Sequence, residues 1–466
     1  MMEDDFSFSE DPRFSVERYE EMIRNKDQYF FDSQAFYGII DFYIDKNDPI
    51  KALQVAEYAG NQHPYISVFF IKKAQLYLSI HKTDEALRAL EKAESLEPSN
   101  SDIFLVRGGV YSILNRYDEA MNEYIKALEL SDSDEEIYMQ ISLMHQSKGD
   151  FEGAIKYLKL CLEMDTDSQD ALYELAFCYD VLDQHEESVA FYLQYIDTDP
   201  YSYTAWFNLG NAYNKLGQFA KAIDAYDYAI IINDSFASAY FNKGNALVNI
   251  DDFIGAIQVY KTTFEFEPPN ADTYCAIGEC YEKLEQMQES RAYYKKAVKL
   301  DNKLGDAWFG IGVTLDFEDR YFESLYYYKK ALAIDDQNPD YWFAIADARY
   351  KLKQISESEL AYEKVVELNP LDLEAWLDYS SILYEQNKLD QAIGIISEAI
   401  KNNPDGAELY YRMVAYLFSC GKYNEALSFL ELALNLDAEK HIILYEYLPL
   451  LQDNKVIAEL IKKYTA

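Results

Sequence analysis

The sequence repeats one pattern every 34 residues between Ser33 and Lys440. Each copy holds two stretches in which large apolar residues recur at the spacing of an amphipathic helix, with a short turn between them. In the clearest copy, residues 203–236, small residues such as Ala222 lie among the large ones. Small residues let helices approach closely, and large residues fill the spaces between them. A period of this length predicts stacked pairs of helices, because each pair can bury its apolar side only against its neighbours.

Twelve copies follow one another without an insertion. They begin at residues 33, 67, 101, 135, 169, 203, 237, 271, 305, 339, 373 and 407. The fourth residue of a copy is usually aromatic, and all four tryptophans of the chain occupy it, namely Trp206, Trp308, Trp342 and Trp376. The twentieth residue is Ala or Ser in every copy, as the close crossing of two helices requires. An array of this kind leaves no extra loop that could carry chemistry.

The copy at residues 203–236 resembles the tetratricopeptide repeat (TPR). The signature W-x2-L-G-x2-Y, followed by an alanine and an aromatic residue, is matched by Trp206, Leu209, Gly210, Tyr213, Ala222 and Tyr226. The resemblance implies an all-α fold, a right-handed superhelical solenoid of helix-turn-helix repeats. It also implies that the first helix of each repeat lines a concave groove and that the second helix forms the convex side. The implied function is a non-catalytic scaffold that binds other proteins.

The limits of the repeat pattern suggest how the chain is organised. Residues 16–31 lack the repeat pattern but have helical spacing, and a solenoid needs caps because its end repeats would otherwise expose apolar sides. After the last repeat, Pro449 interrupts a further helix, and a final helix is expected near 454–464. We expect four parts: an acidic, mobile N-terminus at 1–15, an N-terminal capping helix at 16–32, twelve repeats at 33–440 and C-terminal capping helices at 441–466.

The composition is strongly acidic. Asp and Glu number 82 against 42 Lys and Arg, which gives a formal net charge of −40. Nucleic acids and anionic membrane surfaces are bound through basic surfaces, so this charge argues against both as partners. It favours partners that carry basic residues, although a solvated acidic surface without any partner would have the same composition.

Signals for membranes, secretion and catalysis are missing from the sequence. No run reaches the roughly 18 apolar residues of a membrane-spanning helix, and the N-terminus lacks the basic and apolar regions of a secretory signal. We therefore expect a cytoplasmic protein without membrane insertion. The phosphate-binding and catalytic motifs GxxxxGK[ST], GxGxxG, HExxH and GxSxG are absent, and the five cysteines form no CxxC pair. The sequence predicts no enzyme, no cofactor and no metal site.

Two rows of residues are expected to line the groove that the resemblance implies. The second residue of a repeat is acidic in eight of twelve copies, and the fifth is aromatic in seven. Carboxylates beside aromatic faces suit Lys and Arg side chains, through charge pairing and cation–π contact. A structural role stays open for each row, because acidic residues are favoured in the first turn of any helix and the aromatic residues can pack against the next repeat. The candidate peptide-binding residues from these helices are Phe207, Phe241, Asp272, Asp306, Phe309, Asp340, Phe343 and Asp347.

Four asparagines add a second candidate feature. Asn208 and Asn211 in one repeat match Asn242 and Asn245 in the next. An amide side chain both donates and accepts hydrogen bonds, so it can hold a peptide backbone. The arrangement is similar to the asparagine ladders by which some TPR and armadillo-type proteins hold extended peptides. Asparagine is also common at these positions of the repeat, so a purely structural role is the alternative.

One specialised TPR site can be tested residue by residue. Co-chaperone TPR domains bind the C-terminal carboxylate of Hsp70 or Hsp90 through asparagines and basic residues spread over three repeats. Asn211 and Asn242 match the two asparagines, but the basic positions are Phe207, Asp272 and Ala276. A carboxylate would meet Asp272 instead of a cation, so the sequence argues against binding of chaperone tails.

The sequence therefore predicts a scaffold that binds an extended, net-basic peptide segment of a partner in its concave groove. The alternative is an assembly protein that self-associates through aromatic residues of the convex side or through the terminal caps. Tyr293, Tyr326 and Tyr327 are candidates for such a convex contact. The sequence leaves the partner and the oligomeric state open.

Overall fold

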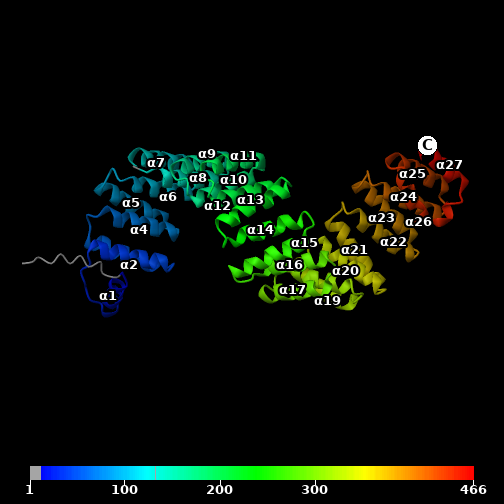
Figure 1. Ribbon diagram of the computed structural model, residues 1–466, viewed down its shortest axis with the longest axis horizontal. Coiled ribbons are helices and arrows are strands. Elements are labelled where there is room, and N and C mark those ends of the chain that lie inside the picture. Colours follow the sequence, from blue (N-terminus) through cyan, green and yellow to red (C-terminus); the bar gives the residue numbers. More distant parts are fainter. Residues whose placement is uncertain (1–11, 132, 466) are drawn as a thin grey trace, which may run out of the picture. The chain divides into compact units, whose positions relative to one another are not determined.

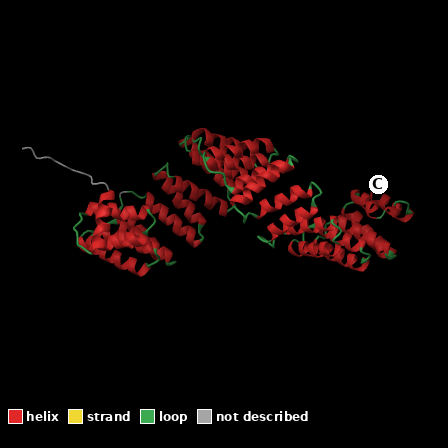
Figure 2. Ribbon diagram, turned by 90° about the horizontal axis from the view of Figure 1, so that it is seen from below, coloured by secondary structure: helices red, strands yellow, loops and turns green. Residues whose placement is uncertain are grey.

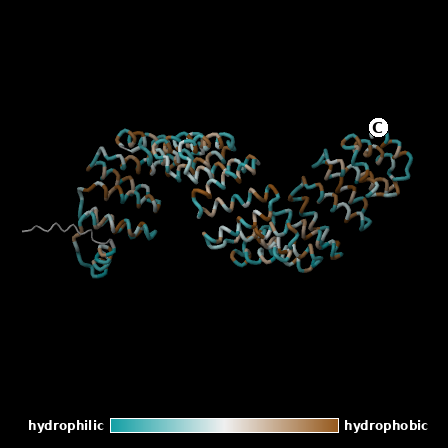
Figure 3. The backbone as a smooth tube through the Cα atoms, in the orientation of Figure 1, coloured by the Kyte–Doolittle hydropathy of each residue, from teal (hydrophilic) through white to brown (hydrophobic). Residues whose placement is uncertain are grey.

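Helices account for all regular secondary structure in the described residues, 12–131 and 133–465, of the computed structural model (Figures 1 and 2). The expected mobile segment at 1–15 falls largely outside these residues. Figure 3 shows hydrophobic and hydrophilic residues mixed along the helices, as expected for helices that have both buried and exposed residues. The all-α fold predicted from the sequence is confirmed.

The helices form twelve consecutive pairs. The first helix of each pair begins at the first residue of a predicted repeat: α2 Ser33–Asp45, α4 Ser67–Ser79, α6 Ser101–Ile113, α8 Glu135–Lys148, α10 Gln169–Val181, α12 Tyr203–Lys215, α14 Ala237–Val248, α16 Ala271–Lys283, α18 Gly305–Asp316, α20 Pro339–Lys351, α22 Leu373–Glu385 and α24 Ala407–Ser419. The second helices are α3 Pro49–Gln62, α5 Thr83–Leu96, α7 Tyr117–Leu130, α9 Phe151–Met164, α11 His185–Thr198, α13 Phe219–Ile232, α15 Phe253–Thr262, α17 Met287–Leu300, α19 Tyr321–Leu332, α21 Ile355–Leu368, α23 Leu389–Asn402 and α25 Tyr423–Leu436.

Further helices pack at both ends of the array. Helix α1 spans Pro12–Asn25, so it lies earlier than the helix that the sequence predicts over 16–31. Proline is well suited to the first turn of a helix, and Lys26 takes a left-handed backbone conformation that ends it. At the other end, α26 (Ile442–Tyr447) stops before Pro449, and α27 (Lys455–Thr465) follows. Helix α27 buries Ile457 against the last repeat.

The turn within each pair is built in the same way. The residue at position 15 of every repeat has a positive φ angle, and only three of the twelve are glycines: Asn47, His81, Asn115, Gly149, Asp183, Gly217, Asp251, Glu285, Asp319, Lys353, Asn387 and Gly421. A left-handed residue closes the last turn of a helix and reverses the chain. The second helix can therefore fold back onto the first.

Small residues set the distance between the paired helices. At position 20, every Ala or Ser side chain is at most 4% exposed. The tryptophan at position 4 closes the turn that precedes it: the indole Nε1 of Trp206 donates to the carbonyl of Pro200 (3.0 Å), and that of Trp376 donates to the carbonyl of Pro370 (2.9 Å). These two features explain why the same residue types recur at a fixed period.

The first helices form the inner layer of the stack. Successive first helices pack directly against each other, as in α4 with α6, α10 with α12 and α16 with α18. Successive second helices of the described repeats make no comparable contact. First helices of neighbouring repeats therefore approach each other more closely than second helices do, as in a stack whose concave side is lined by its first helices. We call them inner helices and the second helices outer helices.

The chain divides into two compact units, residues 1–234 and residues 235–466. Each has its own apolar core. In the first unit, one core cluster joins α9 to α13 around Leu172 and Tyr192. In the second unit, a large cluster runs from α19 to α27 and includes Tyr328, Tyr362 and Trp376. The boundary falls between α13 and α14, which are the outer helix of the sixth repeat and the inner helix of the seventh.

Candidate functional site

In five repeats, a buried tyrosine at position 24 of the repeat crosses the inner helix at a glycine. Tyr260 and Tyr328 are each 1% exposed. Their rings lie so close to Gly244 and Gly312 that a Cβ atom on either glycine would overlap the ring. Only glycine leaves room for the ring at this crossing. The ring thereby carries its hydroxyl group to the polar side chains of the inner layer.

In the second unit these hydroxyls donate to a row of polar side chains. The bonds are Tyr260 Oη to Asn245 Oδ1 (2.6 Å), Tyr294 Oη to Glu282 Oε2 (2.8 Å), Tyr328 Oη to Asp316 Oδ2 (3.4 Å) and Tyr362 Oη to Asp378 Oδ2 (3.5 Å). The acceptors lie on inner helices α14, α16, α18 and α22. Each is half-buried, so one side of the group is held by the core while the other remains accessible.

The carboxylates of this row are poorly compensated. The pKa of Asp378 is raised to about 6, mainly by burial and also by the charges of Glu374 and Asp347, while Arg412 and the hydroxyl of Tyr362 oppose the rise. Burial likewise raises the pKa values of Asp316 and Glu282. These groups have lost hydration without gaining an equal amount of positive charge. They therefore favour any cation that reaches them.

Lys351 shows that an ammonium group fits among these carboxylates. Its Nζ lies 2.8 Å from Asp347 Oδ2 and 3.2 Å from Asp316 Oδ1. Burial lowers the pKa of Lys351, but its hydrogen bonds to the two carboxylates raise it overall. A lysine from another chain would find the same kind of partner at Asp378 and Glu282.

The predicted acidic residues at position 2 are on the surface. Asp272, Asp306 and Asp340 are all exposed. Asp306 also accepts a hydrogen bond from Tyr341 Oη (2.6 Å), which orients its carboxylate toward α20. These residues stand in the first turns of α16, α18 and α20.

The predicted aromatic residues at position 5 support the buried tyrosines. The ring of Phe309 lies 5.3 Å from that of Tyr328 and 5.0 Å from that of Tyr341. Phe241 lies 5.4 Å from Tyr260, and Phe343 lies 5.6 Å from Tyr362. Phe241, Phe309 and Phe343 are half-buried, so they pack within the protein and present only part of each ring to the surface.

The structure corrects the expectation for Asn208, which the sequence placed on the groove surface. Its side chain is 2% exposed, and its Nδ2 donates to the carbonyl of Leu172 (3.2 Å) and contacts Tyr192 Oη (3.4 Å). The amide is held in the core because it satisfies these buried polar groups. Phe207 is also buried, at 8% exposure, between Tyr173 and Tyr226.

The remaining predicted asparagines are half-buried. Asn211 Oδ1 accepts from Tyr226 Oη (2.8 Å), just as Asn245 does from Tyr260. Asn242 lies on α14 beside Phe241. Three of the twelve predicted residues, Phe207, Asn208 and Asn211, belong to the first unit. The other nine belong to the second unit.

Sequence reasoning missed Glu282, Asp316 and Asp378. The acidic row was expected at position 2, whereas Glu282 and Asp316 lie at position 12 of their repeats and Asp378 lies at position 6. A signal was nevertheless present, because the tyrosine at position 24 recurs in the neighbouring repeats, and a buried hydroxyl requires a hydrogen-bond partner.

The inner surface of the first unit exposes apolar side chains on α10. On α10, Tyr173, Phe177 and Val181 follow one another at a spacing of four residues and are 39%, 52% and 46% exposed. They form an apolar stripe on one side of the helix. The carboxylate of Asp180 beside the stripe pairs with Lys215 (2.9 Å).

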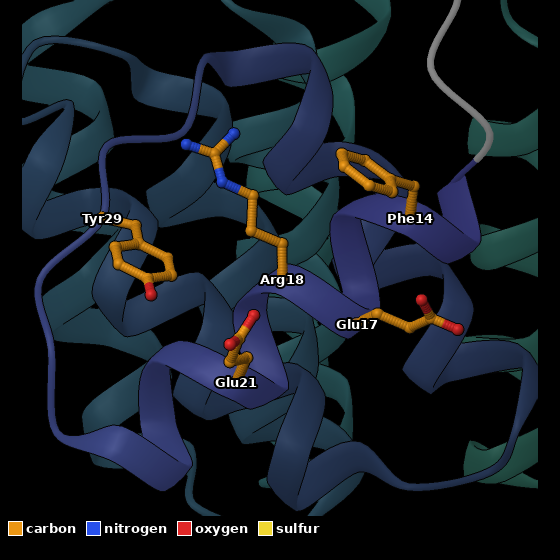
Figure 4. Close-up of a pocket in the computed structure, with 5 residues that line it drawn as sticks. All are labelled: Phe14, Glu17, Arg18, Glu21 and Tyr29. Carbon is orange, nitrogen blue, oxygen red and sulfur yellow. The ribbon is translucent and has the colours of Figure 1, made fainter.

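A shallow cleft of about 380 Å³ lies against α1. Phe14, Glu17, Arg18 and Glu21 come from the helix, and Tyr29 comes from the segment that follows it (Figure 4). The guanidinium group of Arg18 is 5.7 Å from the centre of the Tyr29 ring. The cleft thus combines opposite charges with aromatic rings but contains no nucleophile paired with a base.

Two features are absent from the described residues. No group of three or more His, Cys, Asp or Glu side chains there is arranged to hold a metal ion. No helix there is both long enough and apolar enough to span a bilayer.

Several solved structures are similar to this chain. A crystal structure of the APC/C hetero-tetramer Cut9–Hcn1 matches with a TM-score of 0.43 and 14% identity, over 84% of this chain and 90% of that one. YrrB, described as a TPR protein with an unusual peptide-binding site, matches with a TM-score of 0.34 and 20% identity, over 42% of this chain and 97% of its own. A TPR protein from Parabacteroides merdae ATCC 43184 matches with a TM-score of 0.42 and 14% identity, over 54% and 98% of the two chains. No curated protein sequence matches the chain.

Models of the tetratricopeptide repeat match the sequence from the second repeat to the twelfth. The matched residues are 71–135, 146–200, 203–236, 271–304, 343–407 and 407–440. Members of the family are typically non-catalytic scaffolds. Three of the matches, 203–236, 271–304 and 407–440, coincide with the sixth, eighth and twelfth helix pairs, and this chain belongs to the tetratricopeptide repeat family.

Proposed function

We propose that the protein is an interaction scaffold and that the inner helices α16 to α22 of its second unit bind an extended, net-basic segment of a partner protein. One observation carries the proposal: the half-buried carboxylates Glu282, Asp316 and Asp378 all have raised pKa values. Lys351 already pairs with Asp316. A Lys or Arg side chain of a partner placed beside Glu282 or Asp378 would supply the positive charge that these two groups lack. Each contact of this kind is weak at a protein surface, so an extended ligand that makes several contacts is required.

Residues predicted from the sequence fit around this row. Asp272, Asp306 and Asp340 would attract basic side chains at the start of each inner helix. Phe241, Phe309 and Phe343 would contribute the edges of their rings, and Asp347 already holds one ammonium group. Asn242 and Asn245 would contact the peptide backbone, and Asn211 would do the same in the first unit. Asn208 and Phe207 are buried, so we leave them out of the proposed contact surface.

Binding of labelled decalysine to the full chain, measured by fluorescence anisotropy, tests the proposal. The double variant Asp316→Asn/Asp378→Asn keeps the shape of both side chains and an acceptor for the tyrosine hydroxyls. We expect it to bind roughly tenfold more weakly, since it loses two charged contacts. The control Glu363→Gln/Glu431→Gln removes two exposed carboxylates from outer helices α21 and α25 and should bind like the wild type. Equal losses in both variants would show that only net charge matters.

The same carboxylates make the binding dependent on pH. A basic ligand favours the charged form of Asp378, so it lowers the pKa of that group from about 6. Binding should weaken as the pH falls through about 6, because Asp378 then takes up a proton. Near that pH, binding should release protons. Calorimetry in two buffers of different ionisation enthalpy measures the release, and the Asp378→Asn variant should show less of it.

Self-association through the C-terminal cap is a second candidate function. Ile442, Leu450 and Val456 are 59%, 84% and 57% exposed, which is unusual for large apolar residues at the end of a solenoid. Measuring the mass in solution over a range of concentrations tests it. A constant monomer mass would remove this candidate.

A further inference from the structure

The outer helices of the eighth and ninth repeats carry more basic than acidic residues, whereas the chain as a whole is strongly acidic. Helix α17 carries Arg291, Lys295, Lys296 and Lys299 with a single carboxylate, Glu289. Helix α19 carries Lys329 and Lys330 with a single carboxylate, Glu323. The inner helices of the same repeats, α16 and α18, together hold five carboxylates and one basic residue. Charge is therefore separated between the inner and outer layers of these two repeats.

Six lysines on this side form what we call the outer basic surface: Lys295, Lys296, Lys299, Lys303, Lys329 and Lys330. All six are exposed. The ion pairs of this region involve other cations: Arg291 pairs with Glu318, and Arg320 pairs with Glu318 and Glu323. Among the described residues, no carboxylate forms an ion pair with any of the six lysines. Their charge is thus available to a partner.

Aromatic residues join the two outer helices into one surface. Val298 of α17, Trp308 of α18 and Tyr327 of α19 belong to the same apolar cluster. The indole Nε1 of Trp308 donates to the carbonyl of Asn302 (3.0 Å), in the turn that holds Lys303. The ammonium group of Lys330 lies 5.9 Å from the centre of a ring of the same tryptophan. Figure 1 shows α17 and α19 along one edge of the second unit.

The rings also hold lysine side chains in place. The Nζ of Lys296 lies 4.1 Å from the centre of the Tyr293 ring and 5.3 Å from that of Tyr274. Lys330 lies 5.6 Å from the Tyr326 ring. A cation over an aromatic face keeps its charge while losing mobility. Less conformational entropy is then lost when a ligand binds.

We propose that the outer basic surface binds a short acidic segment of a partner protein. This surface is distinct from the inner face, so the protein would hold a basic segment on one side of these repeats and an acidic one on the other. Lysine ammonium groups suit carboxylates as point charges. Each lysine–carboxylate contact is weak by itself. An acidic segment that contacts several lysines at once would bind through the sum of these contacts.

The charge of the whole chain favours a short segment over a long polyanion. The net charge is −40, and electrostatic interactions reach about 8 Å at physiological ionic strength. A nucleic acid longer than the surface would be repelled by the carboxylates around it, whereas a short acidic segment meets only the lysines. A symmetric contact between two copies would place the same lysines against each other, so a symmetric dimer does not fit this surface.

Binding of labelled decaglutamate to the full chain at physiological ionic strength tests the proposal. The double variant Lys299→Glu/Lys330→Glu changes one lysine on or beside each outer helix, at exposed positions. We expect roughly tenfold weaker binding of decaglutamate and no loss of decalysine binding. The matched control Lys401→Glu/Lys462→Glu makes the same change of charge on α23 and α27. It should bind decaglutamate as the wild type does, and circular dichroism verifies that both variants are folded.

Three results would overturn the proposal. The first is that the wild type does not bind decaglutamate at physiological ionic strength. The second is that the control variant loses as much affinity as the test variant. The third is that the wild type self-associates and that Lys299→Glu/Lys330→Glu abolishes the association, which would make a second copy the occupant. Failure of decalysine to bind would count only against the inner-face proposal, so the two proposals can be judged separately.

Discussion

Gly312 and Tyr328 illustrate how one missing side chain shapes the inner surface. The tyrosine ring lies against the glycine, and its hydroxyl reaches Asp316 on the same inner helix. The same pairing recurs between Gly244 and Tyr260, where the hydroxyl reaches Asn245. A tyrosine that packs in the outer helix therefore determines which polar side chain of the inner helix is held by a hydrogen bond at the surface.

Replacing Gly312 with alanine should destabilise the protein by about 1–3 kcal/mol, because the new Cβ overlaps the buried ring and forces the helices apart. Chemical denaturation followed by circular dichroism measures the effect. Gly394 in α23 provides the control, since a Cβ there meets no atom within 4 Å. Gly394→Ala should stabilise by about 0.5–1 kcal/mol, because alanine is favoured over glycine in a helix. Changes of the same sign in both variants would contradict the steric explanation.

At the scale of the helix, the left-handed residue at position 15 ends every inner helix. Gly149, Gly217 and Gly421 occupy it in three repeats, and the other nine repeats use residues with side chains. A side chain in this conformation is strained. The array keeps its turn in every repeat even where the local sequence disfavours it, because the packing of the two helices requires the reversal.

Replacing Glu285, whose φ angle is 57°, with glycine should therefore stabilise the protein. The strain of roughly 1–2 kcal/mol is relieved, and the greater freedom of glycine in the unfolded chain offsets part of it, which leaves a gain of about 0.5–1 kcal/mol. Thermal unfolding measures it. Glu363→Gly, within helix α21, removes the same charge and should cost about 1 kcal/mol. A loss of stability in Glu285→Gly would show that its side chain makes contacts worth more than the strain.

At the scale of the whole molecule, charge is in large excess but is not evenly spread. The 82 acidic residues outnumber the 42 basic ones, so repulsion among carboxylates opposes folding over the chain as a whole. Even so, the outer helices α17 and α19 are basic. The solenoid thus offers surfaces of opposite sign within the same repeats.

Raising the concentration of sodium chloride from about 0.01 M to 0.15 M should raise the melting temperature. The range of electrostatic interactions falls from about 30 Å to about 8 Å over this interval, so repulsion between distant carboxylates is screened. Surface ion pairs such as Lys351 with Asp347 weaken as well, but they are fewer than the unpaired carboxylates. Thermal unfolding at fixed pH measures the change. A melting temperature that stays constant or falls would show that the excess charge does not limit stability.

The repeat array was predictable in detail, whereas its ends and its surface were not. Trp206 and Ala222 mark the period because their packing roles depend on residues within the same repeat or the adjoining turn. The first capping helix was misplaced, because Pro12 and Lys26 set its limits through local backbone preferences that the repeat pattern does not contain. Asn208 was expected at the surface because its neighbours in the sequence do not reveal that it is covered.

The sequence by itself determined the class of the protein: a 34-residue period of large and small apolar residues can bury its apolar surface only as stacked helix pairs, which define the family. The tertiary structure alone decided which polar side chains serve the core and which remain accessible. Asn208 is buried by a bond to Leu172, which lies 36 residues away, whereas Asp378 is held at the surface by Tyr362 from the preceding repeat. Burial and pKa depend on neighbours from other repeats, and the pattern within one repeat does not specify where those neighbours place their polar atoms.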